Sequence, residues 1–288
     1  MKIGVIYPQT ELKGDPSAVH RIGLAAEELG FHHLLTYDHV LGATHDREPK
    51  LNGPYTEKET FHDPIVMFGY LAAITKRIEF VTGILILPQR QTVLVARQAA
   101  DLDLLSRQRL RLGIGIGWNY VEYDAMGQDF RVRGKRVAEQ IGLLRKLWSE
   151  DLVTFKGTYD SIDRAALNPR PKRMIPVWLG GFADVALQRA AAIGDGFIFV
   201  DGAADAFEQV AKIKQYLAQA SRPLEGFGLQ CNMLRAKTPK DVVDTVLRWR
   251  EAGGTHASVV TMGQKFTTIE QHIDYMKRVA EAIRNAGM

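Results

Sequence analysis

The sequence predicts a (β/α)8 barrel, in which eight parallel strands close into a ring and a helix follows each strand. Eight short apolar or β-branched segments alternate with helical patterns along nearly the whole chain. No linker or change in composition divides the 288 residues, so we predict a single domain over 1–288. An open doubly wound sheet is the alternative, and the strand count favours the closed barrel.

The predicted strands are short and apolar, as expected where helices cover a parallel sheet. They are residues 3–7, 32–37, 78–85, 110–116, 176–179, 195–200, 226–234 and 255–261. Apolar residues at helical spacing predict helices over 17–29, 92–105, 133–148, 182–193, 206–220, 239–252 and 269–286. Residues 150–175 interrupt this rhythm with a hairpin-like stretch and a Pro-rich run. We interpret them as an insertion between units four and five.

Composition excludes several classes of protein. The 46% of hydrophobic residues argues against disorder, and Cys231 is the single cysteine, so no internal disulfide is possible. No apolar run approaches the roughly 18 residues that a membrane helix needs. The net charge of +4 is spread along the chain, which argues against nucleic-acid binding. We therefore expect a cytoplasmic protein that binds neither membrane nor nucleic acid.

The active site of such a barrel lies where its strands end. His39 follows the second strand and could donate or accept a proton, because imidazole titrates near neutral pH. Asp38 could orient His39 or bind a ligand; the structural alternative is that Asp38 caps a turn and His39 packs there. His32 and His33 precede the strand, at the opposite end, and are interpreted as structural.

Glycines follow or end two other strands. Gly180 and Gly181 could present backbone N–H groups to a phosphate, or they could make only a tight turn. The run GIGIGW at 113–118 lacks the third glycine of a dinucleotide motif, because Trp118 stands there. Its small residues leave room for a ring, which Trp118 could stack against unless it is an ordinary packed aromatic.

A metal site is the alternative to an organic cofactor at this end of the barrel. Five residues could cluster: His39, His45, Asp46, His62 and Asp63. The chain has no HExxH motif and no nucleophile elbow, so we predict no metal ligands at this site. A metal-dependent barrel hydrolase remains the less favoured alternative.

Several segments together resemble the bacterial luciferase-like monooxygenase superfamily, especially its branch that depends on the deazaflavin coenzyme F420. They are 26–40, TGILILPQR at 82–90, ARQAADLDLLS at 96–106, 109–118, PVWLGG at 176–181 and GDG at 194–196. The resemblance covers most of residues 1–200 and fades in the last third. The order and spacing of these segments make the resemblance specific.

The resemblance implies a barrel that holds F420 or FMN at the carboxyl ends of its strands. It places Asp38 and His39 beside the cofactor ring and the substrate, as the predicted catalytic residues. It places a non-prolyl cis peptide at Gly83-Ile84, behind the ring. Three residues, Gly117, Trp118 and Asn119, would line the ring or its side chain, and Gly180 and Gly181 would hold the phosphate.

Two departures from the family pattern stand out. The family usually has His-Pro where this chain has Gln91-Thr92, so contacts to the ring or substrate are open there. It usually has Ser-Gly-Gly-Arg where this chain has the SRQR run at 106–109, and we expect only a changed turn.

The expected function is oxidation or reduction of a small organic substrate, by hydride transfer or by oxygen activation. The expected partners are that substrate, a second copy of the chain in a homodimer and, if the cofactor is FMN, a flavin reductase. A barrel that binds flavin without catalysis is the alternative function. The sequence does not identify the substrate.

Overall fold

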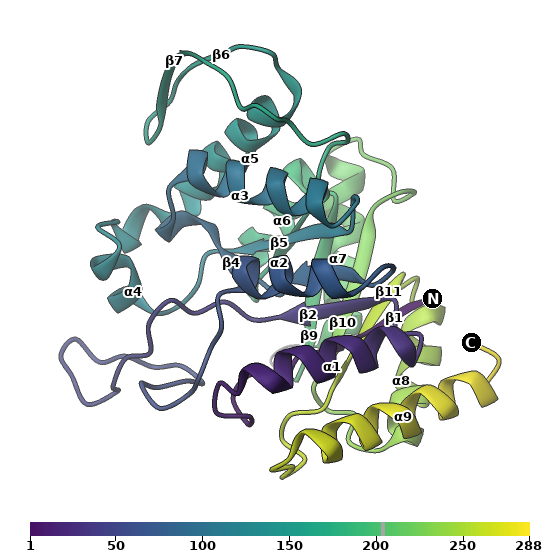
Figure 1. Cartoon of the computed structure of the whole chain (residues 1–288). Coiled ribbons are helices and arrows are strands. Elements are labelled where there is room, and N and C mark those ends of the chain that lie inside the picture. The colour runs from purple at the N-terminus through teal and green to yellow at the C-terminus, as the bar shows by residue number, and fades with distance from the viewer. Residues whose placement is uncertain (203–204) are drawn as a thin grey trace.

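The computed structural model describes residues 1–202 and 205–288, and its main sheet closes into a barrel (Figure 1). The strands are β1 (Lys2–Ile6), β2 (His33–Thr36), β3 (Glu79–Thr82), β4 (Leu85–Ile86), β5 (Leu110–Gly115), β6 (Val153–Lys156), β7 (Ser161–Ala165), β8 (Val177–Gly180), β9 (Gly196–Asp201), β10 (Gly228–Met233) and β11 (His256–Val260). The helices are α1 (Pro16–Glu28), α2 (Pro64–Ile74), α3 (Thr92–Leu105), α4 (Tyr120–Ala125), α5 (Arg133–Ser149), α6 (Asp184–Ile193), α7 (Ala206–Gln219), α8 (Pro239–Glu251) and α9 (Ile269–Asn285).

All pairings in the main sheet are parallel, in the order β3-β2-β1-β11-β10-β9-β8-β5, and β5 pairs again with β3 to close the ring. The short β4 also pairs with β5, so β3 and β4 share one position in the barrel. The cis peptide bond Gly83-Ile84 separates them. The predicted barrel is therefore confirmed, and its eight positions match the eight predicted strands.

Neighbouring residues on the strands belong to two different apolar layers, because successive side chains point to opposite faces. Val5 and Leu34 pack between sheet and helices, whereas Ile6 and Leu35 face the inside of the barrel. Trp178 also lies inside, where its indole covers the backbone of β9 and β10. The interior is thus a packed core and not a pore.

The helix α2 is the main element for which the sequence analysis gave no range. Asp63 caps it by accepting the N–H groups of Ile65 and Val66, and Pro64 occupies its first turn. Its residues are apolar on nearly every side, so no helical periodicity marks it. The short helix α4 follows β5 and was also not predicted.

The predicted insertion lies between α5 and β8 and contains the antiparallel hairpin β6–β7. Figure 1 shows this hairpin outside the barrel, at the top of the view. The Glu139 carboxylate of α5 holds its turn by accepting the N–H groups of residues 158, 159 and 160. The hairpin thus packs on a barrel helix.

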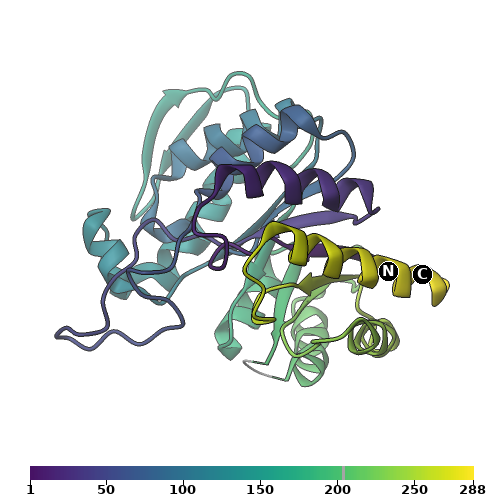
Figure 2. The ribbon, with the colours of Figure 1, turned by 60° about the horizontal axis from the view of Figure 1, so that its bottom comes forward.

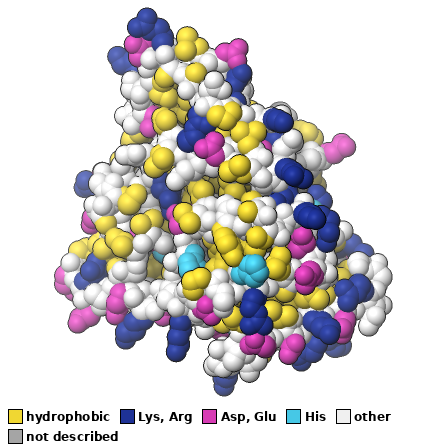
Figure 3. Space-filling model, viewed as in Figure 1, with side chains coloured by type: hydrophobic (Ala, Val, Ile, Leu, Met, Phe, Trp, Pro, Cys, Tyr) yellow, Lys and Arg dark blue, Asp and Glu magenta, His cyan; other side chains and the backbone are white. Residues whose placement is uncertain are grey.

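The segment between β2 and α2 leaves the barrel at the end where the strands finish, close to α4 (Figures 1 and 2). Within the described ranges, no helix is both long enough and apolar enough to cross a lipid bilayer. Basic and acidic side chains are interspersed over the face drawn in Figure 3.

Candidate active site

His39 lies at the carboxyl end of β2 and is held by Glu122, which lies in α4. The Nδ1 atom of His39 lies 3.1 Å from Oε1 of Glu122, and both side chains are buried. The same oxygen accepts the N–H groups of Val40 and Leu41, at 2.8 and 3.2 Å. An oxygen that accepts two amide hydrogens is an acceptor for Nδ1 as well, so the proton of the imidazole sits on Nδ1. This leaves Nε2 as the ring atom that can exchange a proton.

Asp38 does not orient His39; its carboxylate binds other partners. Oδ2 accepts the N–H of Ile86 at 2.9 Å, and Oδ1 accepts from Arg90 at 2.7 Å. Burial raises the pKa of the Asp38 carboxyl, and the charge of Arg90 opposes that rise. Arg90 also reaches Asp63, at 3.3 Å. Arg90 thus ties together the two ends of the segment between β2 and α2.

Trp118 lies in a group of aromatic rings that joins this segment to the barrel. Its ring centroid lies 5.5 Å from that of His39, and His39 lies 5.4 Å from Tyr55 and 4.8 Å from Phe61. A side chain at Gly53 would collide with the Trp118 indole, so the backbone of the segment rests on it. The segment therefore covers His39 and Trp118.

Bare backbone surrounds Ile84 where the strands end. A Cβ atom at Gly115 or Gly180 would come within 2.8 Å of the Ile84 side chain, closer than real Cβ atoms approach. A Cβ at Gly117 would lie 2.9 Å from Ile86. The predicted cis bond at Gly83-Ile84 is present. These positions require glycine for close approach.

Gly181 precedes α6 and has φ +153°, within the region that favours glycine. The N-cap residue of α6, Ala183, offers no side-chain oxygen, and among residues 1–202 and 205–288 no side chain caps the first N–H groups of this helix. Asp184 lies in the first turn, but its carboxylate bonds to Gln188 and Tyr216. The amides after Gly181 are thus able to bind an anion.

Other predicted residues have structural partners. Asn119 caps α4 by accepting the N–H of Val121, and its amide lies 3.3 Å from the Leu41 carbonyl. His45 contacts the Tyr55 carbonyl, and Asp63 caps α2. Among the described residues, the one group able to hold a metal is at the opposite end of the barrel, so the structure does not gather the five metal candidates at this end.

Comparison with known proteins agrees with this geometry. The model of the family described as "Luciferase-like monooxygenase" matches residues 1–281. The chain belongs to the luciferase-like monooxygenase family. An uncharacterized protein of Mycobacterium tuberculosis (strain ATCC 25618 / H37Rv) is 30% identical over 270 residues, which cover 90% of this chain and 92% of that protein. An F420-dependent glucose-6-phosphate dehydrogenase of Amycolatopsis mediterranei (strain U-32) is 31% identical over 208 residues, 70% of this chain and 58% of that enzyme.

Solved structures share this luciferase-like barrel. Monooxygenase RslO1 from Streptomyces bottropensis superposes with a TM-score of 0.82 at 19% identity, over the whole of both chains. An F420-dependent secondary alcohol dehydrogenase in complex with an F420-acetone adduct gives 0.79 at 19% identity, over 98% of this chain and 99% of that one. Family and relatives together identify an enzyme of the oxidoreductase class.

Glu122 and Arg90 are the residues that the sequence analysis left without a role. Both follow predicted strands at the carboxyl end, which is the signal that could have placed them near the site. Their partners could not be read from sequence, because His39 and Glu122 are 83 residues apart and Asp38 and Arg90 are 52 apart.

Proposed function

We propose that this chain transfers a hydride between F420 and a small organic substrate, with His39 exchanging a proton with that substrate. The observation that carries this proposal is the His39–Glu122 pair, which leaves Nε2 available at the mouth of the barrel. The relatives named as F420-dependent enzymes support the deazaflavin. FMN is the alternative cofactor, supported by the structural match to a riboflavin lyase with modified FMN, and it would require a flavin reductase.

The residues present fit a phosphorylated tricyclic ring. The amides after Gly181 suit its phosphate. The backbone at Gly115, Gly117 and Gly180 carries no side chain of its own, and the Ile84 and Ile86 side chains that pack on it would form an apolar surface for the ring. Gly83 and Ile84 would support the ring from behind, and Trp118 and Asn119 would line it. When bound, such a ring supplies hydride transfer or, for a flavin, reaction with oxygen.

The protein's own residues would position the substrate and handle its proton. Glu122 fixes the orientation of the imidazole and stabilises its protonated form. The segment between β2 and α2 covers His39, so it would exclude water and shape the substrate pocket. Asp38 and Arg90 would act through this segment, because they hold its ends.

A homodimer is also part of this proposal. The helices α2 and α3 expose large apolar side chains, among them Val66, Leu94 and Leu105. Hydrophobic side chains gather over the centre of the face in Figure 3, where α2 lies in Figure 1. A second copy of the chain would bury them.

The decisive experiment titrates the purified protein with F420 and with FMN and follows absorbance and fluorescence. We expect saturable binding of F420 and reduction of substrates from a panel of small alcohols and sugar phosphates by the loaded protein. His39→Ala should retain cofactor binding and lose turnover. Normal turnover in that variant would exclude the role of His39, and cofactor binding without any turnover would favour a non-catalytic binding barrel.

A further inference from the structure

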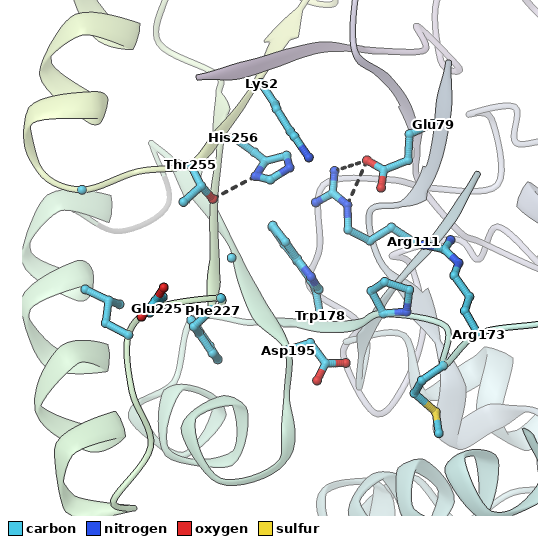
Figure 4. A pocket seen from close by; sticks show the side chains of 16 residues that line it. Lys2, Glu79, Arg111, Arg173, Trp178, Asp195, Glu225, Phe227, Thr255 and His256 are labelled. Atoms are coloured by element: carbon cyan, nitrogen blue, oxygen red, sulfur yellow. Dashed lines mark hydrogen bonds and ion pairs between the residues drawn. The ribbon is translucent and has the colours of Figure 1, made fainter. Parts of the chain in front are cut away.

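A second polar site lies at the other end of the barrel, where the strands begin. A cavity of about 820 Å³ opens there, and Lys2, Glu79, Arg111, Trp178 and His256 are among the side chains that line it (Figure 4). The side chains of Lys2, Arg111 and His256 point into the same space above Trp178. The proposed oxidoreductase chemistry uses none of these groups.

Two adjacent histidines and a glutamate meet beside this cavity. His32, His33 and Glu79 each offer one ligand atom, and the three atoms lie within 4.8 Å of one another. The separation between Nδ1 of His32 and Oε2 of Glu79 is 3.7 Å. His33 and Glu79 are direct neighbours across β2 and β3. The sheet register therefore fixes this group.

His33 provides an independent sign of a missing partner. Its side chain is fully buried, and its Nε2 atom lies 2.8 Å from Oγ of Ser258. Its Nδ1 atom, like that of His32, is buried without a hydrogen-bond partner in the described chain. A buried ring nitrogen without a partner costs free energy unless a ligand satisfies it.

The surrounding groups resemble the outer shell of a metal site. Ser258 orients the His33 ring through its other nitrogen, as the partners of metal-bound histidines do. Arg111 donates to Oε2 of Glu79 at 2.9 and 3.1 Å and does not engage the other carboxylate oxygen. Lys2 and Arg111 bring positive charge, which opposes any divalent cation and most strongly disfavours Mg²⁺ or Ca²⁺, because these ions are held mainly by charge. Imidazole ligands favour a transition metal such as Zn²⁺.

We propose that His32, His33 and Glu79 bind one divalent transition-metal ion, with Zn²⁺ the best match, at the amino-terminal end of the barrel. Two histidines and a carboxylate form a common three-ligand zinc set that leaves a fourth position open. His256 is not among the residues whose ligand atoms meet within 4.8 Å, and its Nδ1 atom lies 2.8 Å from Oγ1 of Thr255. The ion would link β2 to β3.

The test uses full-length, untagged protein freed of metal by a chelator. Co²⁺ should bind at one equivalent with visible absorption bands, and Zn²⁺ but not Mg²⁺ should displace it. The variants His32→Gln and Glu79→Gln should each weaken binding by about tenfold or more. His20→Gln is the matched control, because that histidine lies on α1 against Tyr70, and it should bind as the wild type does. Absence of a one-to-one complex, or equal affinity in all variants, would overturn the proposal.

A second measurement avoids variants that fail to fold. Long-range ¹H–¹⁵N spectra of the wild-type histidines should show the ring nitrogens of His32 and His33 shifting on addition of Zn²⁺. The signals of His20 should stay in place. Zinc should also raise the unfolding temperature, because it binds the folded state. Shifts confined to other histidines would refute the site.

Discussion

Oε1 of Glu122 lies 3.1 Å from Nδ1 of His39, and the same oxygen accepts the N–H groups of the two residues that follow His39 in the chain. One buried carboxylate thus sets both the ring orientation and the path of the backbone as it leaves the barrel. The two functions can be separated, because a neutral amide oxygen can still accept from the backbone whereas it cannot stabilise a protonated imidazole by charge.

Glu122→Gln should therefore lower kcat by about 100-fold, the usual size of a proton-transfer contribution. The dissociation constant of the cofactor should stay unchanged, because the backbone contacts to residue 122 remain. Steady-state kinetics and a fluorescence titration check the two quantities. Glu57→Gln, at an exposed residue of the neighbouring segment, should behave as the wild type does. A parallel loss of cofactor affinity in Glu122→Gln would instead indicate a structural role.

Gly181→Val should weaken binding of the phosphorylated cofactor by about tenfold or more. A branched side chain is strained at φ +153°, and its Cβ would lie 2.9 Å from that of Ala186, so the amides before α6 would move. Binding of the same ring without its phosphate should change much less. Gly142→Ala is the control, because a Cβ atom at this helical position would meet no other described part of the chain within 4 Å. Equal losses for both ligands would show that the phosphate lies elsewhere.

The sequence predicted this fold well because its signals are local. Each strand of the barrel is a short, mostly buried run, and the range 92–105 coincides with α3. The helix α2 was not given a range because it is apolar on nearly all sides, so its burial leaves no periodic pattern. Fold class follows from repeated local patterns even when single elements are missed.

The site was less predictable because its key contacts are distant in sequence. The rule that active sites lie at the carboxyl ends of barrel strands placed Asp38 and His39 at the correct end of the barrel. It could not show that Arg90 binds the Asp38 carboxylate. The pair formed by His39 and Glu122 likewise depends on α4, which the sequence analysis did not predict. Residue types after the strands predict where the site lies. The contacts between the side chains of the site become visible only in the three-dimensional structure.

Gly228→Ala should lower the free energy of unfolding by about 3 kcal/mol. A methyl group at this position would overlap the Trp178 indole, which closes the amino-terminal end of the barrel interior. Urea denaturation measures the loss. In a Trp178→Leu background the same substitution should cost much less, because the ring that it meets is gone. Equal costs in both backgrounds would mean that the strain arises from the strand backbone.

The turn before β5 should be stabilised by glycine. Arg107 and Gln108 replace the two glycines of the family pattern and adopt φ values of 60° and 66°. Whether the turn differs from that of the family stays a prediction. Replacing both with glycine should add about 1 kcal/mol of stability, because glycine tolerates these angles without a Cβ penalty. Thermal unfolding checks the gain, and a fall in stability would contradict it.

Gly30→Ala provides the converse control for that turn. Gly30 has φ +86°, and no atom lies within 4 Å of the place that a methyl group would occupy, so only its backbone angle opposes a side chain. The substitution should lower stability by about 1 kcal/mol. If Gly30→Ala left the free energy of unfolding unchanged, the energetic cost of positive φ in this protein would be too small to explain a stability gain from glycine at residues 107 and 108.

His272 should make the fold less stable as the pH falls below about 6.5. Burial lowers the pKa of His272 from 6.5 to about 4, and its Nδ1 atom bonds to Thr261, while Glu11 lies 3.4 Å from Nε2. Between these values the unfolded chain binds the proton and the folded chain does not. The contribution of His272 to stability is therefore complete above pH 6.5 and declines toward pH 4, by about 2 kcal/mol at pH 5. Urea denaturation at pH 7.5 and pH 5 should show a smaller difference for His272→Gln than for the wild type, and an equal difference would exclude this histidine as a source of the acid sensitivity.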